Sequence, residues 1–358
     1  NLDLPFNMGT NSEGQMDRLF FVLEGAYDEW ARSQSEGNVI LYDTSHGTNP
    51  YGLKLGCFTT VGNSGQTIIL AVSLLQDETA QMFTWAFRKF CEHFRSPPSV
   101  LFTDGDVAME AAFRECSAEG QPMQRTKHLL CTFHRSKNLY KNIRPLFIGD
   151  LRKWQEFHSA WWSLTKDTEF TGASDASWEA DWEALTQIVV DHGKGEKKAD
   201  KLKWLAELGR KAQKFGARFT WQQRTYGVHS TQRAEAIHSA LKRYITSSTF
   251  ITELVEFLVR YNNDSRAAKQ VDAVRSALRS AGLHGGELPI VTAMRNKLTP
   301  YAYEVLAAQA KQALQYSPPK LLPEPMAEDA LPGAHDGDAR CWSVSRIATG
   351  GTKTSAQV

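Results

Sequence analysis

The first 150 residues alternate between short apolar runs and longer segments in which apolar positions recur with a helical spacing. Three β-type runs, at residues 38–43, 53–62 and 67–76, are separated by stretches rich in Gly, Asn and Pro, which are turn formers. Because the connections are short, these runs predict an antiparallel meander.

Residues 77–94 repeat apolar side chains every three or four positions after a cap signal at Asp77, a pattern typical of a helix. A β run at 97–106, a helix at 107–116 and a last strand at 127–134 follow. The order βββαβαβ predicts an α/β fold.

Between residues 150 and 225 lie seven of the ten tryptophans, many at helical spacings, which predicts an all-α insertion. Helical periodicity resumes at 230–245 and 248–269, and a Pro-, Ala- and Asp-rich stretch follows Pro318. We expect five parts: an N-terminal lead-in from a longer chain at 1–37, the first part of a core at 38–149, the insertion at 150–225, helices that complete the core at 226–316, and a linker with a truncated tail at 317–358.

The composition, with 42% hydrophobic and 23% charged residues, is ordinary for a soluble globular protein. A net charge of +1 neither favours nor excludes a nucleic-acid partner, because acids elsewhere can balance a basic groove. The longest apolar stretch, 67–75, is far shorter than the ~20 residues that span a membrane. Five cysteines without a CxxC pair argue against a disulfide framework and indicate a reducing compartment.

Two aspartates share one context. Asp43 and Asp104 each close an apolar β run, "VILYD" and "VLFTD", and turn residues follow at once. In open α/β sheets the functional crevice lies at strand ends, so the two carboxylates converge if their strands are neighbours. The alternative, which is equally consistent with the sequence, is that each aspartate caps the turn beside it or the next helix.

A third acid, Glu235, lies on the predicted helix 230–245. At 100° per residue, Ile237, Leu241 and Tyr244 fall on one face and Glu235 lies on the other. Such a residue is either a solvated surface acid or part of a site with the two aspartates.

Four segments together resemble one family, in its order, from about Met16 to Tyr261: "ILYDTSHGTNPYG", "VLFTDGDVAMEAAF", "LLCTFHRSKNLYK" and "STQRAEAIHSALKRYI". They are similar to the catalytic domain of the Mutator-like element (MULE) transposases of the DDE superfamily. The resemblance implies a ribonuclease H-like mixed five-stranded sheet, βββαβαβ-α, interrupted by an all-α insertion before the last catalytic helix. Departures are His238, where the family usually has Asn, and a single cysteine, Cys341, where members often carry a zinc module.

The resemblance also implies chemistry. Asp43, Asp104 and Glu235 would be the catalytic and metal-binding carboxylates for two Mg²⁺ or Mn²⁺ ions, which prefer oxygen ligands. His134 would lie near the active site, contacting the scissile phosphate or ordering a water, and Cys131 would be structural. Two plainer readings of this Cys-His pair stay open: ordinary buried residues, or ligands of a structural zinc ion.

Phosphate neutralisation by basic side chains would carry the binding of DNA. The candidate DNA-binding residues are Arg233, His238, Lys242, Arg243 and Lys137. Trp221 is expected to brace the catalytic helix. The implied partners are double-stranded DNA with terminal inverted repeats, target DNA, and a second copy in a homodimer or larger assembly, in the nucleus and away from any membrane.

Three functions fit these residues. The first is a DNA transposase that hydrolyses phosphodiesters at terminal repeats and transfers the 3′-hydroxyl strand into target DNA. The second is a domesticated, non-catalytic DNA-binding transcription regulator related to the far-red-response proteins of plants. The third is a structure-specific nuclease on the same fold.

Overall fold

The computed structural model describes residues 4–33, 38–62, 66–166, 175–220 and 230–280, with the isolated residues and short pieces 223, 225, 228, 294, 302–303, 306–309, 320–321, 342–345 and 355–357. Trp221 and most of the expected linker and tail at 317–358 lie outside the described residues.

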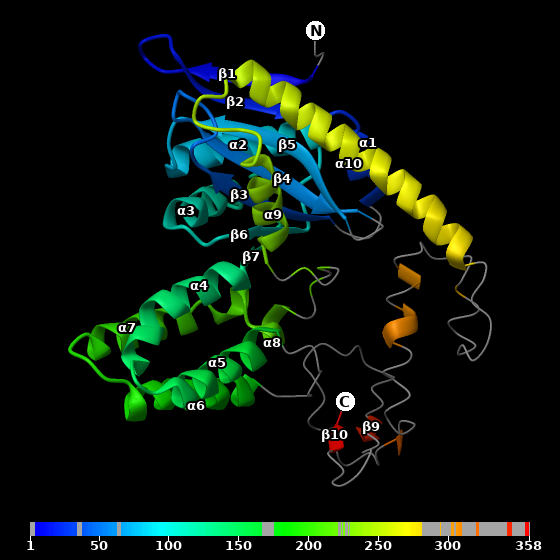
Figure 1. Cartoon of the computed structure of the whole chain (residues 1–358). Coiled ribbons are helices and arrows are strands. Elements are labelled where there is room, and N and C mark those ends of the chain that lie inside the picture. Colours follow the sequence, from blue (N-terminus) through cyan, green and yellow to red (C-terminus); the bar gives the residue numbers. More distant parts are fainter. Residues whose placement is uncertain are drawn as a thin grey trace.

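A seven-stranded mixed sheet forms the centre of the fold, in the order β1-β2-β5-β4-β3-β6-β7 (Figure 1). Strands β3, β4 and β5 pair antiparallel as the predicted meander, whereas β6 runs parallel to β3 and β7 parallel to β6. The α/β class is therefore confirmed. The strands are β1 Phe6–Thr10, β2 Met16–Val22, β3 Val39–Ser45, β4 Lys54–Val61, β5 Thr67–Leu75, β6 Val100–Thr103 and β7 Lys127–Leu130.

The expected five-stranded sheet is wrong in its number of strands. The segment treated as a lead-in contributes β1 and β2, and β2 pairs antiparallel with β5 along residues 18–22. Its apolar side chains Phe20, Phe21 and Val22 are buried on the two faces of the sheet, which covers an edge that β5 would otherwise expose.

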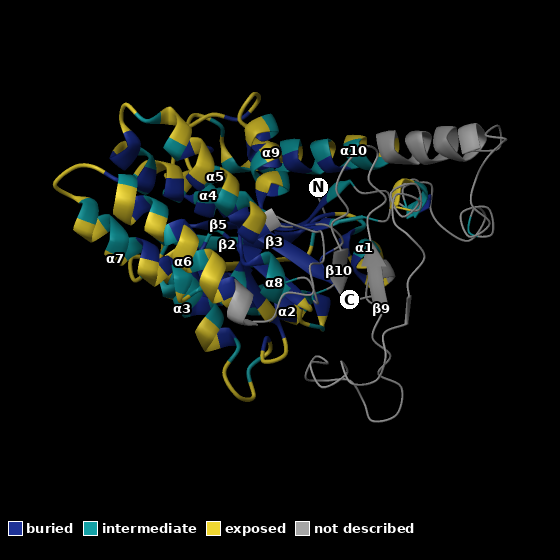
Figure 2. Cartoon of the chain, turned by 90° about the horizontal axis from the view of Figure 1, so that it is seen from below, coloured by how far each residue is buried: buried dark blue, intermediate teal, exposed yellow. Residues whose placement is uncertain are grey.

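Helices cover both faces of this sheet, so that its strands are buried between two layers (Figure 2). On one face lie α1 (Ala26–Ser33), α2 (Ala80–Phe94) and α3 (Val107–Cys116), and Phe87 of α2 packs edge-on against Tyr42 of β3. On the other face lie α9 (Gln232–Leu241) and α10 (Ile251–Ser280). Phe21 of β2 and Val72 of β5 belong to this second core.

Between β7 and α9, the described residues from 151 to 220 form helices and turns without a strand. They follow α4 (Thr132–Ile143) and the 3-10 turn Arg144–Phe147, and comprise α5 Leu151–Lys166, α6 Asp175–His192, α7 Lys198–Gly209, the 3-10 turn Ala212–Lys214 and α8 Ala217–Thr220. This helical lobe lies below the sheet in Figure 1. Trp161, Phe157 and Phe215 are fully buried in its centre, so packing accounts for the aromatic residues here.

Two predicted boundaries are wrong. The last strand ends at Leu130, and the residues after Cys131 begin α4, because the Cys131 thiol accepts the backbone N–H of His134 and caps the helix. Helix α2 is capped by Thr79 rather than Asp77, whose carboxylate accepts the N–H and hydroxyl of Thr79.

Further along the chain, β8 (Lys320–Leu321), β9 (Trp342–Ser345) and β10 (Ser355–Gln357) pair in a three-stranded sheet. Among the helices that the structure describes, none combines the length and the apolar character needed to cross a membrane.

Candidate functional site

Asp43 lies within β3, which continues to Ser45, and not in a turn after the strand. Side chains alternate along a strand, and Leu41 faces the layer that holds Ala234 of α9, whereas Tyr42 faces α2. Asp43 therefore points to the α9 side of the sheet, where it is buried. The turn-cap reading of this aspartate is excluded by its position.

Asp104 follows β6, the parallel neighbour of β3, so the two strands carry their aspartates to the same edge of the sheet. One carboxylate oxygen of Asp104 accepts the N–H of Asp106 at 2.9 Å, and Asp106 caps α3. The buried guanidinium of Arg135 donates to the Asp104 carbonyl oxygen. The N–H of Asp106 and the guanidinium of Arg135 thus hold the turn at Asp104. Neither bond uses the second carboxylate oxygen of Asp104.

Glu235 of α9 and His134 of α4 meet at this edge. The Nε2 of His134 lies 2.9 Å from Oε1 of Glu235, and Nζ of Lys137 lies 3.3 Å from the same oxygen. One ligand atom each from Asp43, His134 and Glu235 all lie within 4.8 Å of one another. The tightest group therefore includes the histidine, and Asp104 lies beside it.

Cys131 and Thr231 join the two helices that carry His134 and Glu235. The Cys131 thiol accepts the backbone N–H of Thr231 at 3.1 Å, and Nδ1 of His134 lies 3.1 Å from the Thr231 hydroxyl. Because the Glu235 carboxylate can only accept, Nε2 of a neutral His134 carries the proton and Nδ1 accepts from Thr231. Thr231 precedes α9 without capping it through its side chain, which is used for His134 instead.

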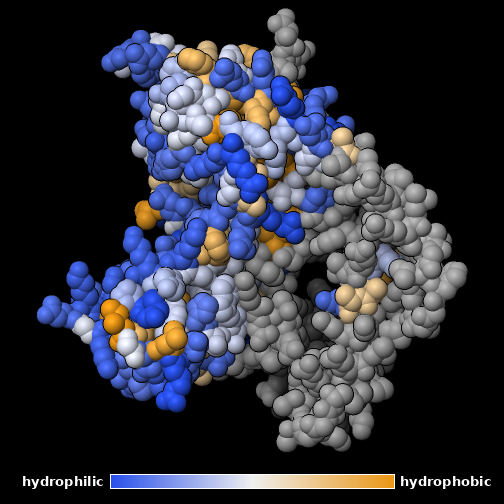
Figure 3. Space-filling model, viewed as in Figure 1, coloured by the Kyte–Doolittle hydropathy of each residue, from blue (hydrophilic) through white to orange (hydrophobic). Residues whose placement is uncertain are grey.

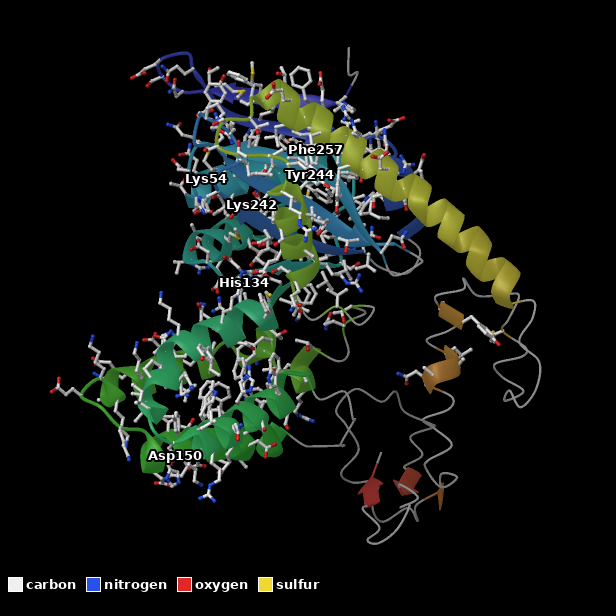
Figure 4. The ribbon with its side chains drawn as sticks, viewed as in Figure 1. Lys54, His134, Asp150, Lys242, Tyr244 and Phe257 are labelled. Atoms are coloured by element: carbon white, nitrogen blue, oxygen red, sulfur yellow. The ribbon has the colours of Figure 1, made fainter. Side chains whose placement is uncertain are left out.

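The carboxylates and His134 line one cavity of about 390 Å³. In Figure 4, His134 lies where the sheet and the helical lobe meet, at the end of α9 nearest to α4. Its lining includes Asp43, Asp104, His134, Lys137, Glu235 and Lys242.

Burial and neighbouring charges shift the proton affinities of three groups in this pocket, namely Asp43, Asp104 and His134. Burial and then the charges of Asp104 and Glu235 raise the pKa of Asp43 to about 7. Burial also raises the pKa of Asp104. Burial lowers the pKa of His134, against the opposing pull of Glu235 and Asp104. Buried carboxylates with like-charged neighbours are stabilised by a bound cation. Their oxygen-rich donor set suits a hard divalent ion such as Mg²⁺ or Mn²⁺. The residues therefore fit such a metal.

The zinc reading of Cys131 and His134 does not fit. The Cys131 thiol is buried and faces two backbone N–H groups, whereas the imidazole faces Thr231 and Glu235. Burial raises the pKa of this thiol, which opposes the thiolate that zinc needs.

The candidate DNA-binding residues divide into three groups. Lys137 and Lys242 are exposed and line the cavity. Arg233 is half-buried on α9, and Arg243 is exposed just beyond that helix. His238 differs from the expectation, because it is buried and its Nε2 lies 3.2 Å from the main-chain oxygen of Asp43. This histidine therefore supports the strand that carries Asp43, and it also lines the cavity.

Among the pocket residues that were missed from the sequence are Thr44, His46 and Glu78. Glu78 accepts the Thr44 hydroxyl at 2.7 Å, and His46 lies 3.4 Å from the same carboxylate oxygen, so both line the cavity beside Asp43. The residues "DTSH" at the end of β3 were available as a signal for Thr44 and His46, and "DE" before α2 for Glu78.

Fold and site together define a mixed α/β protein with a pocket of carboxylates and histidine at the edge of its sheet. The sequence model of one family, the MULE transposase domain, matches residues 39–138, which include Asp43, Asp104 and His134. The resemblance to the Mutator-like element transposases is thereby confirmed for this stretch.

Relatives in Arabidopsis thaliana extend the similarity. FAR1-RELATED SEQUENCE 10 is 27% identical over 304 residues, 82% of this chain and 39% of the relative. FAR1-RELATED SEQUENCE 5 is 23% identical over 279 residues, 73% of this chain and 32% of the relative. FAR-RED IMPAIRED RESPONSE 1 is 23% identical over 257 residues, 70% of this chain and 27% of the relative.

The chain spans between 27% and 39% of the length of these curated relatives. Their names agree with the expectation of a domesticated protein related to the far-red-response proteins better than with the expectation of an active transposase.

Proposed function

We propose that the chain is the ribonuclease H-like core of a transposase-derived DNA-binding protein, and that its pocket binds Mg²⁺ or Mn²⁺ for phosphodiester cleavage. The observation that carries this proposal is the approach of Asp43, His134 and Glu235 to within 4.8 Å, from three elements far apart in the sequence. The strands β3 to β7 support the ribonuclease H-like part, because they follow one another as βββαβαβ with β1 and β2 as additions.

The residues have distinct roles in this proposal. Asp43, Asp104 and Glu235 would hold two metal ions. Such ions would activate a water or a 3′-hydroxyl as the nucleophile and stabilise the leaving oxygen. The neutral His134, fixed by Thr231, would orient Glu235 and hold a proton at Nε2. Lys137 and Lys242 would attract the DNA phosphates to the rim.

A second candidate is a DNA-binding transcription regulator that does not cut. The comparisons favour this candidate, since the relatives carry names of the far-red-response type. Both candidates share the fold, the DNA partner and a nuclear location, and they differ in whether the pocket performs chemistry. Terminal inverted repeats, target DNA and pairing of two copies belong to the first candidate alone.

The decisive experiment combines metal binding with cleavage. Calorimetry with Mn²⁺ on the wild-type protein and on Asp43→Asn, Asp104→Asn and Glu235→Gln tests the site. A labelled duplex bearing the terminal repeat of the encoding element, incubated with Mn²⁺, tests nicking and joining. We expect metal-dependent nicking by the wild type alone. Metal binding and DNA binding without nicking would establish the second candidate, and no Mn²⁺ binding would overturn the metal site.

A further inference from the structure

Three aromatic rings lie in a row between the end of α9 and the side of α10. The ring centroids of Tyr244 and Phe257 are 5.2 Å apart with 31° between their planes, and those of Phe257 and Tyr261 are 6.3 Å apart with 26°. Phe257 and Tyr261 are half-buried, whereas Tyr244 is 68% exposed. Tyr244 is thus the outer ring of a supported stack.

Tyr244 closely follows, in the chain, residues that line the pocket. Lys242, two residues before Tyr244, lines the cavity with Glu235. In Figure 4, His134, Lys242, Tyr244 and Phe257 follow one another from the base of α9 towards α10. Tyr244 lies nine positions after Glu235 in the chain and three after Leu241, where α9 ends.

We propose that Tyr244, backed by Phe257, is a stacking platform for an unpaired base of a DNA strand whose phosphates lie along Lys242 and Arg243. A π-face accepts any base, and base–aromatic stacking beside cations is how proteins hold single strands without reading sequence. The inference rests on the proposed function, because it names the form of DNA that reaches the pocket: a duplex with unpaired nucleotides at the fork.

The charges around the stack favour DNA over a protein partner. Lys242 and Arg243 are exposed and directly precede Tyr244 in the chain. On α10, Glu253 accepts the backbone N–H of Phe250, and the exposed Glu256 is matched by the exposed Arg260 on the same helix. The surface of this side of the molecule is predominantly hydrophilic with small apolar patches, so an extended apolar interface is not offered here (Figure 3).

Binding of a forked duplex and of a blunt duplex of the same sequence tests the platform. The full chain is used without divalent metal, so that no cleavage occurs, and 2-aminopurine at the unpaired position reports stacking by its quenching. We expect Tyr244→Ala to weaken binding of the forked duplex about 5- to 150-fold, as the loss of one stacked base implies, and to restore the fluorescence. Tyr244→Phe keeps the ring and is expected to bind as the wild type does.

Tyr140→Ala is the matched control, because Tyr140 is also exposed, at 58%, and packs edge-on against Trp154 in the helical lobe. It is expected to leave fork binding unchanged. If the wild type and Tyr244→Ala each bind the forked and the blunt duplex equally tightly, the stacking platform is overturned. A change of oligomeric state without a change in DNA binding would assign the stack to a protein contact instead. Asp104→Asn, which lacks cleavage in the proposed function, is expected to retain the stacking signal, so the two ideas fail separately.

Discussion

The thiol of Cys131 accepts a hydrogen bond from the backbone N–H of Thr231, 100 residues further along the chain, at 3.1 Å. The same sulfur accepts the N–H of His134, so one buried atom holds the first turns of α4 and α9 together. Those two helices carry His134 and Glu235, whose side chains meet at 2.9 Å. The position of Glu235 in the pocket therefore depends on a residue that does not reach the pocket.

Replacing this thiol should separate the two helix ends. Cys131→Ala removes the acceptor of the buried Thr231 N–H and of the partly buried His134 N–H, and should lower the free energy of unfolding by about 1–3 kcal/mol in urea titrations. It should also weaken Mn²⁺ binding, because the start of α9, and with it Glu235, is no longer held against α4. Cys131→Ser restores an acceptor and should recover part of both quantities.

Cys116→Ala is the control for this experiment. Cys116 is equally buried, but its thiol donates to the Thr84 carbonyl oxygen on the opposite face of the sheet. It should reduce stability and leave Mn²⁺ affinity unchanged. If Cys131→Ala binds Mn²⁺ as tightly as the wild type does, the coupling between this thiol and Glu235 is refuted.

His238 supports the backbone at Asp43, because its Nε2 lies 3.2 Å from the main-chain oxygen of Asp43. Burial lowers the pKa of this histidine to about 4, so it is neutral at pH 7. His238→Ala should therefore reduce Mn²⁺ affinity by about 10- to 100-fold, as the loss of a residue that orients a ligand does. His238→Gln, which can donate to the same oxygen, should lose less. Unchanged Mn²⁺ affinity in His238→Ala would argue for packing alone.

The stability of the protein should fall in mild acid because of His128. This residue is buried between Phe113 and the Thr103 hydroxyl, and burial lowers its pKa to about 3. Between pH 6.5 and about 3 the unfolded chain binds a proton that the folded chain refuses, so stability decreases as pH falls. At pH 5 the loss is about 2 kcal/mol relative to pH 7, from the 1.36 kcal/mol that one pKa unit represents.

Urea unfolding of the wild type and His128→Gln at pH 7 and pH 5 measures this effect. The variant has no imidazole to titrate, so its loss between the two pH values should be smaller by about 2 kcal/mol. Buried acids such as Asp43 titrate in both proteins and cancel in the difference. Equal losses in the two proteins would contradict the assignment.

Glu110 of α3 connects the core to the helical lobe through ion pairs with two lysines of the lobe. Its carboxylate lies 2.8 Å from Nζ of Lys211 and 3.7 Å from Nζ of Lys214, and its side chain is only 11% exposed. A double-mutant cycle with Glu110→Gln and Lys211→Met should give a coupling energy of about 0.5–1 kcal/mol, limited because the lysine is partly exposed. A coupling of zero, measured by urea unfolding, would mean that packing alone holds the lobe in place.

Local patterns in the sequence determined the parts of this protein. Short apolar runs bounded by turn formers located β3, β4 and β5, helical spacing located α2 and α3, and the aspartates were found because each follows an apolar run. Such patterns work because burial against a layer repeats with the period of the element itself. They failed for β1 and β2, where no feature of residues 6–22 indicates that β1 pairs with β2 and β2 with β5.

Only the tertiary structure decided how the parts meet. Glu235 on an isolated helix is equally a solvated acid, and its approach to Asp43 and His134 follows from the packing of α9 on the sheet and from the contact of Cys131 with Thr231. His238 reads as a basic surface residue, yet its helix turns it inward against Asp43. The physical reason is that a contact between distant residues depends on the summed packing of every element between them, and no local repeat in the sequence records that sum.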